Sequence, residues 1–174
     1  MIEKAEQEIK KNVCGELLEK VRMMSADHFE KLVVELLVAM GYGDRNDPKS
    51  GFKVGQSGDG GIDGIIKQDK LGLESIYVQA KRYKDTNKVS PHDVRDFAGA
   101  LMGTMGRSKK GVFITSSDFT NEGIDYVKSI DKNFKIILIN GAELAELMYQ
   151  YGIGVSNAKT IVLNKVDNDY FDED

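Results

Sequence analysis

The chain has 174 residues, of which 41% are hydrophobic and 30% charged, and its formal net charge is −4. These values are typical of one soluble globular domain that is large enough to bury a core. No apolar run approaches the ~20 residues that cross a bilayer, and the charged N-terminus lacks the apolar stretch of a signal peptide. The single cysteine, Cys14, excludes an internal disulfide, and no Cys/His cluster indicates zinc. We therefore expect a cytoplasmic protein without membrane association.

The N-terminal part of the chain has helical periodicity. Apolar residues at helical spacing predict a first helix over Glu3–Met23 and a second over Ala26–Met40. Ser25 is a suitable N-cap for the second helix, and Gly41 supplies its C-terminal stop. The polar, glycine-rich stretch 43–61 predicts a long loop, with a short strand at 52–54, and loops of this length are more often functional than idle.

The rest of the chain alternates between strand and helix patterns. Segments 62–67 and 75–82 are strand candidates, and the turn at 69–72 between them predicts a hairpin. The further expected elements are a helix at 91–102, a strand at 111–115, a helix at 121–130, a strand at 135–139, a helix at 141–149 and a final extended segment at 159–166. Late strands that are each followed by a helix favour parallel pairing, so we predict an α/β fold with a mixed β-sheet flanked by α-helices.

A polar pattern on the second strand of the hairpin is the most informative feature of the sequence. Side chains alternate between the faces of a strand, so Gln79 and Lys81 share one face while Val78 and Ala80 point into the core. Asp63 begins the neighbouring strand. We expect Asp63, Gln79 and Lys81 to meet within a few ångströms on one side of the sheet.

These three groups suit phosphodiester hydrolysis. A carboxylate and an amide oxygen are hard ligands of the kind that Mg²⁺ prefers. A bound metal would polarise a phosphate and lower the pKa of a bound water. The ammonium of Lys81 could orient that water or stabilise charge in the transition state, and a lowered pKa would allow it to act as a base.

Several short motifs, taken in order, resemble those of a known family. An aspartate, about fifteen intervening residues and Gln-x-Lys resemble the active-site signature of the PD-(D/E)XK nucleases in their Mrr variant, a family of type IV restriction endonucleases directed at modified DNA. The matching words are Phe29-Glu30-Lys31-Leu32-Val33, Met40-Gly41-Tyr42-Gly43, Gly58-Asp59-Gly60-Gly61-Ile62-Asp63-Gly64, Val78-Gln79-Ala80-Lys81-Arg82 and Gly111-Val112-Phe113-Ile114-Thr115. The resemblance covers residues 14–171 and implies a restriction-endonuclease-like core.

The resemblance also implies roles for single residues. Asp63 would be a metal ligand, Gln79 would take the position of the usual second carboxylate, and Lys81 would be the catalytic lysine. The carbonyl of Ala80 is a possible extra ligand. The family has an acid in an early helix, and the helical wheel favours Glu30 over Glu35 for that place, although a surface acid in the first helical turn is an equally good interpretation.

Two residues depart from the wider superfamily pattern. Ile62 stands at the position of the proline in the superfamily name. Another residue commonly replaces this proline in such nucleases. Gln79 stands where most members have an acid, and its neutral amide favours a single Mg²⁺, or Mn²⁺ in its place, over two metal ions. The Mrr-type subset characteristically has this glutamine, so it does not imply an inactive enzyme.

Charge is unevenly distributed along the chain. The stretch from Lys81 to Lys110 contains eight basic and three acidic residues, whereas the last ten residues carry a net charge of −4. The basic residues that follow the proposed catalytic strand are candidates for contact with DNA phosphates, with a solvated charged face as the alternative: Arg82, Lys84, Lys88 and Arg95.

Other polar residues near the motifs have two interpretations each. The glycines at 58, 60, 61 and 64 favour a tight turn, with close approach to DNA as an addition. Thr115, Ser116 and Ser117 either touch the DNA backbone or form a capped turn before the next helix.

The expected whole is therefore an N-terminal arm at 1–24, an endonuclease catalytic domain at 25–166 and an acidic tail at 167–174. Its partner would be double-stranded DNA, methylated according to the resemblance, and cutting two strands favours a homodimer or higher homo-oligomer. Relatives commonly carry a separate N-terminal DNA-reading domain. Two alternatives stay open: a structure-specific nuclease such as a Holliday-junction resolvase, and an inactive nuclease-fold domain that serves as a DNA-binding or scaffold module.

Overall fold

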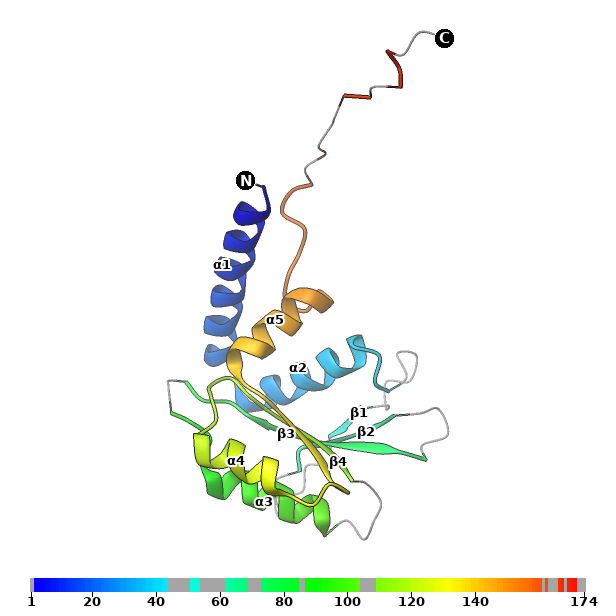
Figure 1. Cartoon of the computed structure of the whole chain (residues 1–174). Helices are drawn as coiled ribbons and strands as arrows, with labels where there is room; N and C mark the ends of the chain where they lie inside the picture. Colours follow the sequence, from blue (N-terminus) through cyan, green and yellow to red (C-terminus); the bar gives the residue numbers. More distant parts are fainter. Residues whose placement is uncertain are drawn as a thin grey trace.

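A computed structural model describes residues 2–43, 51–53, 62–68, 73–84, 87–103, 109–160, 162, 166–167 and 169–171. The described elements follow in chain order: α1 (Ile2–Met23), α2 (Ala26–Ala39), β1 (Gly51–Lys53), β2 (Gly64–Lys67), β3 (Ser75–Lys81), α3 (Pro91–Met102), β4 (Lys110–Thr115), α4 (Asn121–Ser129), β5 (Lys135–Ile139) and α5 (Gly141–Tyr151). The described strands form one mixed sheet in the order β1-β2-β3-β4-β5 (Figure 1).

The sheet confirms the predicted α/β architecture. β2 and β3 pair antiparallel as a hairpin, with Gly64 opposite Val78, and β1 pairs antiparallel with β2. β3, β4 and β5 are parallel, with Gln79 opposite Phe113 and Lys81 opposite Thr115. The connections β3–β4 and β4–β5 each contain a helix, because the chain must cross back over the sheet before it can add a parallel strand.

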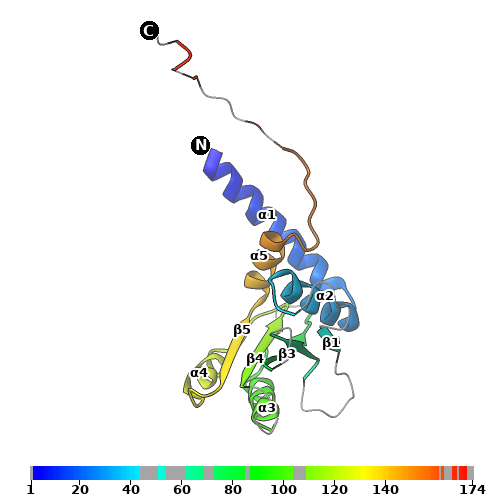
Figure 2. The ribbon, with the colours of Figure 1, turned by 90° about the vertical axis from the view of Figure 1, so that its right-hand side faces the viewer.

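Two apolar layers cover the two faces of the sheet (Figures 1 and 2). On one face, α1, α2 and α5 pack on a core that includes Phe29, Val78 and Ile114. On the other face, α3 and α4 pack on a second core that includes Phe97 and Phe113, whose rings meet edge to face. The alternation of side chains along β3 assigns Val78 to the first core and its neighbour Tyr77 to the second.

Helix caps set the ends of the elements that border the sheet. The side chain of Ser25 accepts a hydrogen bond from the His28 amide at the start of α2, and Gly41 has φ +99 just beyond its end, as the sequence predicted. Ser90 and Asp93 form a reciprocal capping box at the start of α3, with Pro91 in its first turn.

The second half of α1 packs in the core, whereas its first half does not. Leu17 and Val21 of α1 are buried in the first core, whereas Ile2 and Ile9 are exposed. The described residues of the expected extended segment 159–166 form no strand. Among the described helices, none is both long and apolar enough to cross a membrane.

A close approach at the start of α5 gives a test of the packing. A Cβ atom added to Gly141 would lie 2.6 Å from the Ser116 carbonyl oxygen, whereas a Cβ atom at Gly99 of α3 would have nothing within 4 Å. We expect Gly141→Ala to lower the free energy of unfolding by about 1–3 kcal/mol, because a backbone oxygen cannot yield cheaply. Gly99→Ala is the control and should raise it by about 0.5–1 kcal/mol. Urea unfolding of both variants measures this, and equal effects would contradict the packing.

Candidate active site

The strands β2 and β3 part at Asp63. The Asp63 amide donates to the Val78 carbonyl at 2.9 Å, and one position further along β3 the Ala80 amide donates to Oδ2 of the Asp63 side chain at 2.8 Å. Strand amides point along the sheet toward the neighbouring strand. The Asp63 carboxylate therefore accepts a hydrogen bond that a backbone carbonyl of the neighbouring strand would otherwise accept, at the point where the pairing of β2 with β3 ends.

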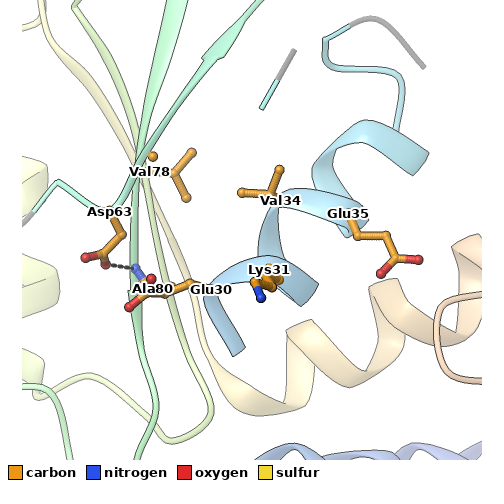
Figure 3. A pocket seen from close by; sticks show the side chains of 8 residues that line it. Glu30, Lys31, Val34, Glu35, Asp63, Val78 and Ala80 are labelled. Carbon is orange, nitrogen blue, oxygen red and sulfur yellow. Dashed lines mark hydrogen bonds between the residues drawn. The ribbon is translucent and has the colours of Figure 1, made fainter. Parts of the chain in front are cut away.

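A pocket opens between α2 and the fork at Asp63, which is the point where β2 and β3 part. Its volume is about 210 Å³, and it is lined by Glu30, Lys31, Val34, Glu35, Asp63, Gly64, Val78 and Ala80. In Figure 3 the carboxylate of Glu30 reaches from α2 toward Asp63 and Ala80, whereas that of Glu35 points away from them. Oε2 of Glu30 is buried. Two carboxylates from distant parts of the chain thus converge on one strand end.

Gln79 lies on the opposite face of β3 from this pocket. It pairs in register with Phe113, which belongs to the second core. Its Oε1 atom is buried and has no hydrogen-bond partner among the residues that the structure describes. A buried amide oxygen without a partner is costly, and such atoms need an explanation such as an ion or a water.

Lys81 forms an ion pair with Asp93 of α3, and its ammonium lies 5.8 Å from the centre of the Tyr83 ring. Burial alone would lower the pKa of Lys81, but the hydrogen bond and charge of Asp93, aided by Tyr83, outweigh it and raise that pKa above its usual value. Burial alone would raise the pKa of Asp93, but the hydrogen bonds from Lys81 and Ser90, together with the Lys81 charge, outweigh it and lower that pKa below its usual value. Lys81 is therefore a firmly charged ammonium rather than a ready base.

The expectation that Asp63, Gln79 and Lys81 share one side of the sheet is met only in part. Gln79 and Lys81 share a face, as predicted, but that face is covered by α3, whereas Asp63 lines the pocket under α2. The physical reason is the fork: Asp63 precedes β2 and turns its carboxylate into the plane of the sheet. The three groups flank the end of β3 from both faces.

The donor set at this strand end fits a divalent cation with oxygen ligands. It combines the carboxylates of Asp63 and Glu30 with the buried amide oxygen of Gln79 and the adjacent Ala80 backbone. Within the described residues, no group of three or more His, Cys, Asp or Glu side chains could hold a metal ion. The oxygen atoms of Asp63, Glu30 and Gln79 are of the kind that Mg²⁺ prefers.

The basic residues that follow β3 differ in their surroundings. Arg82 donates to the Arg22 carbonyl at 3.0 Å and is half-buried, so its guanidinium has a structural contact. Lys88 pairs with Asp118 at 3.0 Å, and the Arg95 guanidinium lies 5.9 Å from the centre of the Tyr126 ring. Lys84, Lys88 and Arg95 are exposed. The exposed members remain candidates for phosphate contact.

Thr115 and Ser116, at the end of β4, form a brace: their side chains hydrogen-bond to the backbone at the end of β3 and just after it. Thr115 Oγ1 donates to the Lys81 carbonyl at 2.7 Å, and Ser116 Oγ both donates to the Tyr83 carbonyl at 2.9 Å and accepts from the Tyr83 amide at 2.8 Å. Thr115 and Ser116 have no exposed surface and Ser117 is buried. The side chains of Thr115 and Ser116 therefore hold the backbone after β3, which supports the structural interpretation of this motif.

Sequence reasoning missed Asp93 and the brace at Ser116. The signal for Asp93 was a Ser-x-x-Asp capping box, which indicates a helix start but not an ion pair with Lys81. No local signal marks Ser116, because its partner lies 33 residues away in the chain. Ser57, Asp59 and the glycines at 58, 60 and 61 lie outside the described residues, and Gly64 is buried at the start of β2.

The mixed α/β sheet with helices on both faces has a fold of the restriction-endonuclease type. The fold is similar to that of the DNA modification-dependent restriction endonuclease AspBHI, with a TM-score of 0.59 at 17% identity over 82% of this chain and 36% of that one. MspJI restriction endonuclease, solved in complex with a 27-mer oligonucleotide, matches with a TM-score of 0.49 at 25% identity over 82% of this chain and 30% of that one.

The sequence comparisons give the family. The model of the Mrr catalytic family, described as restriction endonuclease, matches residues 21–148. The type IV methyl-directed restriction enzyme EcoKMrr of Escherichia coli (strain K12) is 40% identical over 171 residues, which are 98% of this chain and 53% of that protein. The chain belongs to the Mrr family of restriction endonucleases and comprises its catalytic domain. It spans about half the length of that relative.

The brace after β4 gives a test of how the end of β3 is held. We expect Ser116→Ala to lower the free energy of unfolding by about 1–3 kcal/mol, because the partly buried amide and carbonyl of Tyr83 both lose their partner, the fully buried hydroxyl of Ser116. The matched control is Ser129→Ala on α4, whose exposed hydroxyl donates to the Tyr126 carbonyl, and its effect should stay within about 0.5 kcal/mol. Guanidinium unfolding compares the two, and an equally small effect at Ser116 would show that the brace is unimportant.

Proposed function

We propose that this chain hydrolyses phosphodiester bonds of double-stranded DNA with the help of one divalent cation, Mg²⁺ or Mn²⁺. The observation that carries the proposal is the end of β3 in a restriction-endonuclease fold. The carboxylates of Asp63 and Glu30 line a pocket on one side of this strand end, and the buried amide oxygen of Gln79, which has no described partner, lies on the other. Membership of the Mrr family supports the same reaction.

The metal ligands in this proposal are the carboxylate of Asp63, Oε1 of Gln79 and the carbonyl of Ala80. The cation, when bound, supplies Lewis-acid polarisation of the phosphate and a lower pKa for a water molecule. Asp63 is fixed for this role by the Ala80 amide, which leaves its carboxylate at the mouth of the pocket. Gln79 gains the partner that its buried oxygen lacks among the described residues.

Lys81 acts in this proposal as a fixed positive charge. Its raised pKa keeps it protonated at neutral pH, so it orients the attacking water or stabilises the negative charge that develops on the phosphate oxygens. A role as general base is disfavoured by the ion pair with Asp93. The residue thus contributes electrostatic stabilisation rather than proton abstraction.

Glu30 is the fourth member of the proposed site. It stands on α2 across the pocket from Asp63 with its carboxylate directed at the strand end (Figure 3). A carboxylate across the pocket can hold a water molecule or supply an additional oxygen ligand to the cation. The N-cap at Ser25 and the buried Phe29 fix the helix turn from which Glu30 projects.

The proposed substrate is suggested by the relatives, and the proposed assembly by the need to cut two strands. EcoKMrr is a methyl-directed enzyme and AspBHI a modification-dependent one, so we infer that the natural target is DNA with methylated bases. Lys84, Lys88 and Arg95 are exposed and are proposed to contact phosphates, whereas the Arg82 guanidinium donates to the Arg22 carbonyl. Cutting both strands favours a homodimer or higher homo-oligomer. The catalytic unit proposed for residues 25–166 overlaps the family match, which covers residues 21–148 and so begins within α1.

The central test of this function is plasmid cleavage by the unchanged chain and by Asp63→Ala and Lys81→Ala. Each variant should lose about 10²-fold or more in cleavage rate, because Asp63→Ala removes a proposed metal ligand and Lys81→Ala removes the positive charge that stabilises the transition state. Lys128→Ala on the exposed surface of α4 is the control and should cut at the unchanged rate.

The same assay with methylated and unmethylated plasmid, and with a branched duplex, separates the substrate classes. Faster cutting of methylated DNA is the expected result. Preference for the branched duplex would favour a junction-specific nuclease, and activity that survives both site variants would contradict the proposed site.

Glu30 and Glu35 form a matched pair because both line the pocket from α2 but point in different directions. We expect Glu30→Gln to slow cleavage by about 10²-fold, as loss of a positioned acid does, and Glu35→Gln to leave the rate within about twofold. Single-turnover cleavage at saturating Mg²⁺ measures both. A larger effect at Glu35 would overturn the assignment.

A further inference from the structure

Asp93 connects the start of α3 to the proposed catalytic lysine. Its Oδ2 atom accepts from the Ser90 amide at 3.2 Å and from the Ser90 hydroxyl at 2.8 Å, while its Oδ1 atom accepts from the Lys81 ammonium. The Lys81 and Asp93 side chains are 33% and 23% exposed, so water screens this ion pair only in part. Each oxygen of the carboxylate thus has a separate partner, one in the helix cap and one on the strand.

The capping box of α5 shows which of these contacts a cap needs. Asn140 and Glu143 form the same reciprocal pair of hydrogen bonds, at 2.9 and 3.0 Å, in an exposed position. Among the described residues, Glu143 pairs with no basic side chain. A capping acid therefore needs no lysine, and the Lys81 contact of Asp93 is an addition to the cap.

Lys81 is fixed at its backbone as well as at its charged end. Its carbonyl accepts hydrogen bonds from the Thr115 hydroxyl and from the Ser116 amide at 3.4 Å. The ammonium then sits between the Asp93 carboxylate and the Tyr83 ring. A lysine side chain has a flexible four-carbon stem, and holding its ammonium in one place costs conformational entropy that a second anchor offsets.

We propose that Asp93 is the positioning residue of the catalytic lysine: the rigid cap of α3 holds the Lys81 ammonium at the end of β3, ready for the scissile phosphate. This inference rests on the role proposed for Lys81 in phosphodiester hydrolysis. Asp93 acts through Lys81 and has no contact of its own with the substrate. Its expected signature is a lower kcat with little change in KM for DNA.

Asp93→Asn tests the proposal with little change in shape. Asparagine has one side-chain oxygen for two tasks and no charge, so it can keep the cap but cannot hold Lys81 as well. We expect kcat to fall about 10- to 100-fold, as small misplacements of a catalytic group cause, with KM within about twofold. Asp93→Glu should restore most of kcat, because glutamate suits this position of a capping box and keeps the charge.

Two controls separate positioning from folding. Glu143→Gln alters the matched cap on α5 and should leave kcat unchanged, and Ser90→Ala weakens the α3 cap while keeping the Lys81 partner, so it should lower stability more than kcat. In a Lys81→Ala background, Asp93→Asn should cause no further loss. An unchanged kcat in Asp93→Asn, an increased one, or an equal loss in both backgrounds would overturn the proposal.

A chemical measurement tests the same contact without nuclease activity. The rate at which acetic anhydride acylates the Lys81 amine at fixed pH, read by mass spectrometry, should rise several-fold in Asp93→Asn and stay constant in Glu143→Gln. An unchanged rate in Asp93→Asn contradicts the positioning role whatever the enzyme cuts. Failure of the Asp63 and Lys81 variants to lose activity would instead contradict the proposed function.

Discussion

The hydrogen bond from the Ala80 amide to the Asp63 carboxylate is the contact on which the site depends. It lets β2 leave β3 without abandoning a buried strand amide, because the side chain supplies the acceptor that a neighbouring strand would otherwise provide. The parting of the strands opens the pocket under α2, and the same contact fixes the carboxylate that lines it. One interaction thus satisfies the sheet and builds the site.

The last residues of β3 also separate two chemically different environments. Ala80 contributes to the pocket that contains the carboxylates of Glu30 and Asp63, while Lys81, its neighbour, meets Asp93 on the face covered by α3. Strand alternation enforces this division. The negative groups that suit a cation and the positive group that suits a phosphate therefore lie on either side of one strand end without neutralising each other directly. Both are held by helices whose caps are explicit in the sequence.

Much of this arrangement was predictable from local patterns. Periodicity and capping residues predicted the five helices of the described part of the chain to within a few residues, and the hairpin and parallel strands followed from turn signals and alternation. The common face of Gln79 and Lys81 also followed from spacing alone. These features depend on near neighbours in the chain, so a single sequence carries them.

What the sequence could not predict depends on long-range geometry. The in-plane turn of Asp63 depends on how β2 starts, and the ion pair of Lys81 depends on where α3 docks on the sheet. The buried Ser116 resembled a polar loop residue because its partners at Tyr83 and Arg22 are far away in the chain. Such contacts arise only when the layers pack, and here they decide the direction in which each site residue faces.

The central claim is that the end of β3 binds a divalent cation between Asp63 and Gln79. The most direct measurement is anomalous diffraction from a crystal of this chain grown with Mn²⁺. The account predicts a strong anomalous peak within coordination distance of the Asp63 carboxylate and Oε1 of Gln79, and its loss in Asp63→Ala. A peak elsewhere in the well-ordered protein, or no peak at saturating Mn²⁺ with Asp63 intact, would contradict the claim.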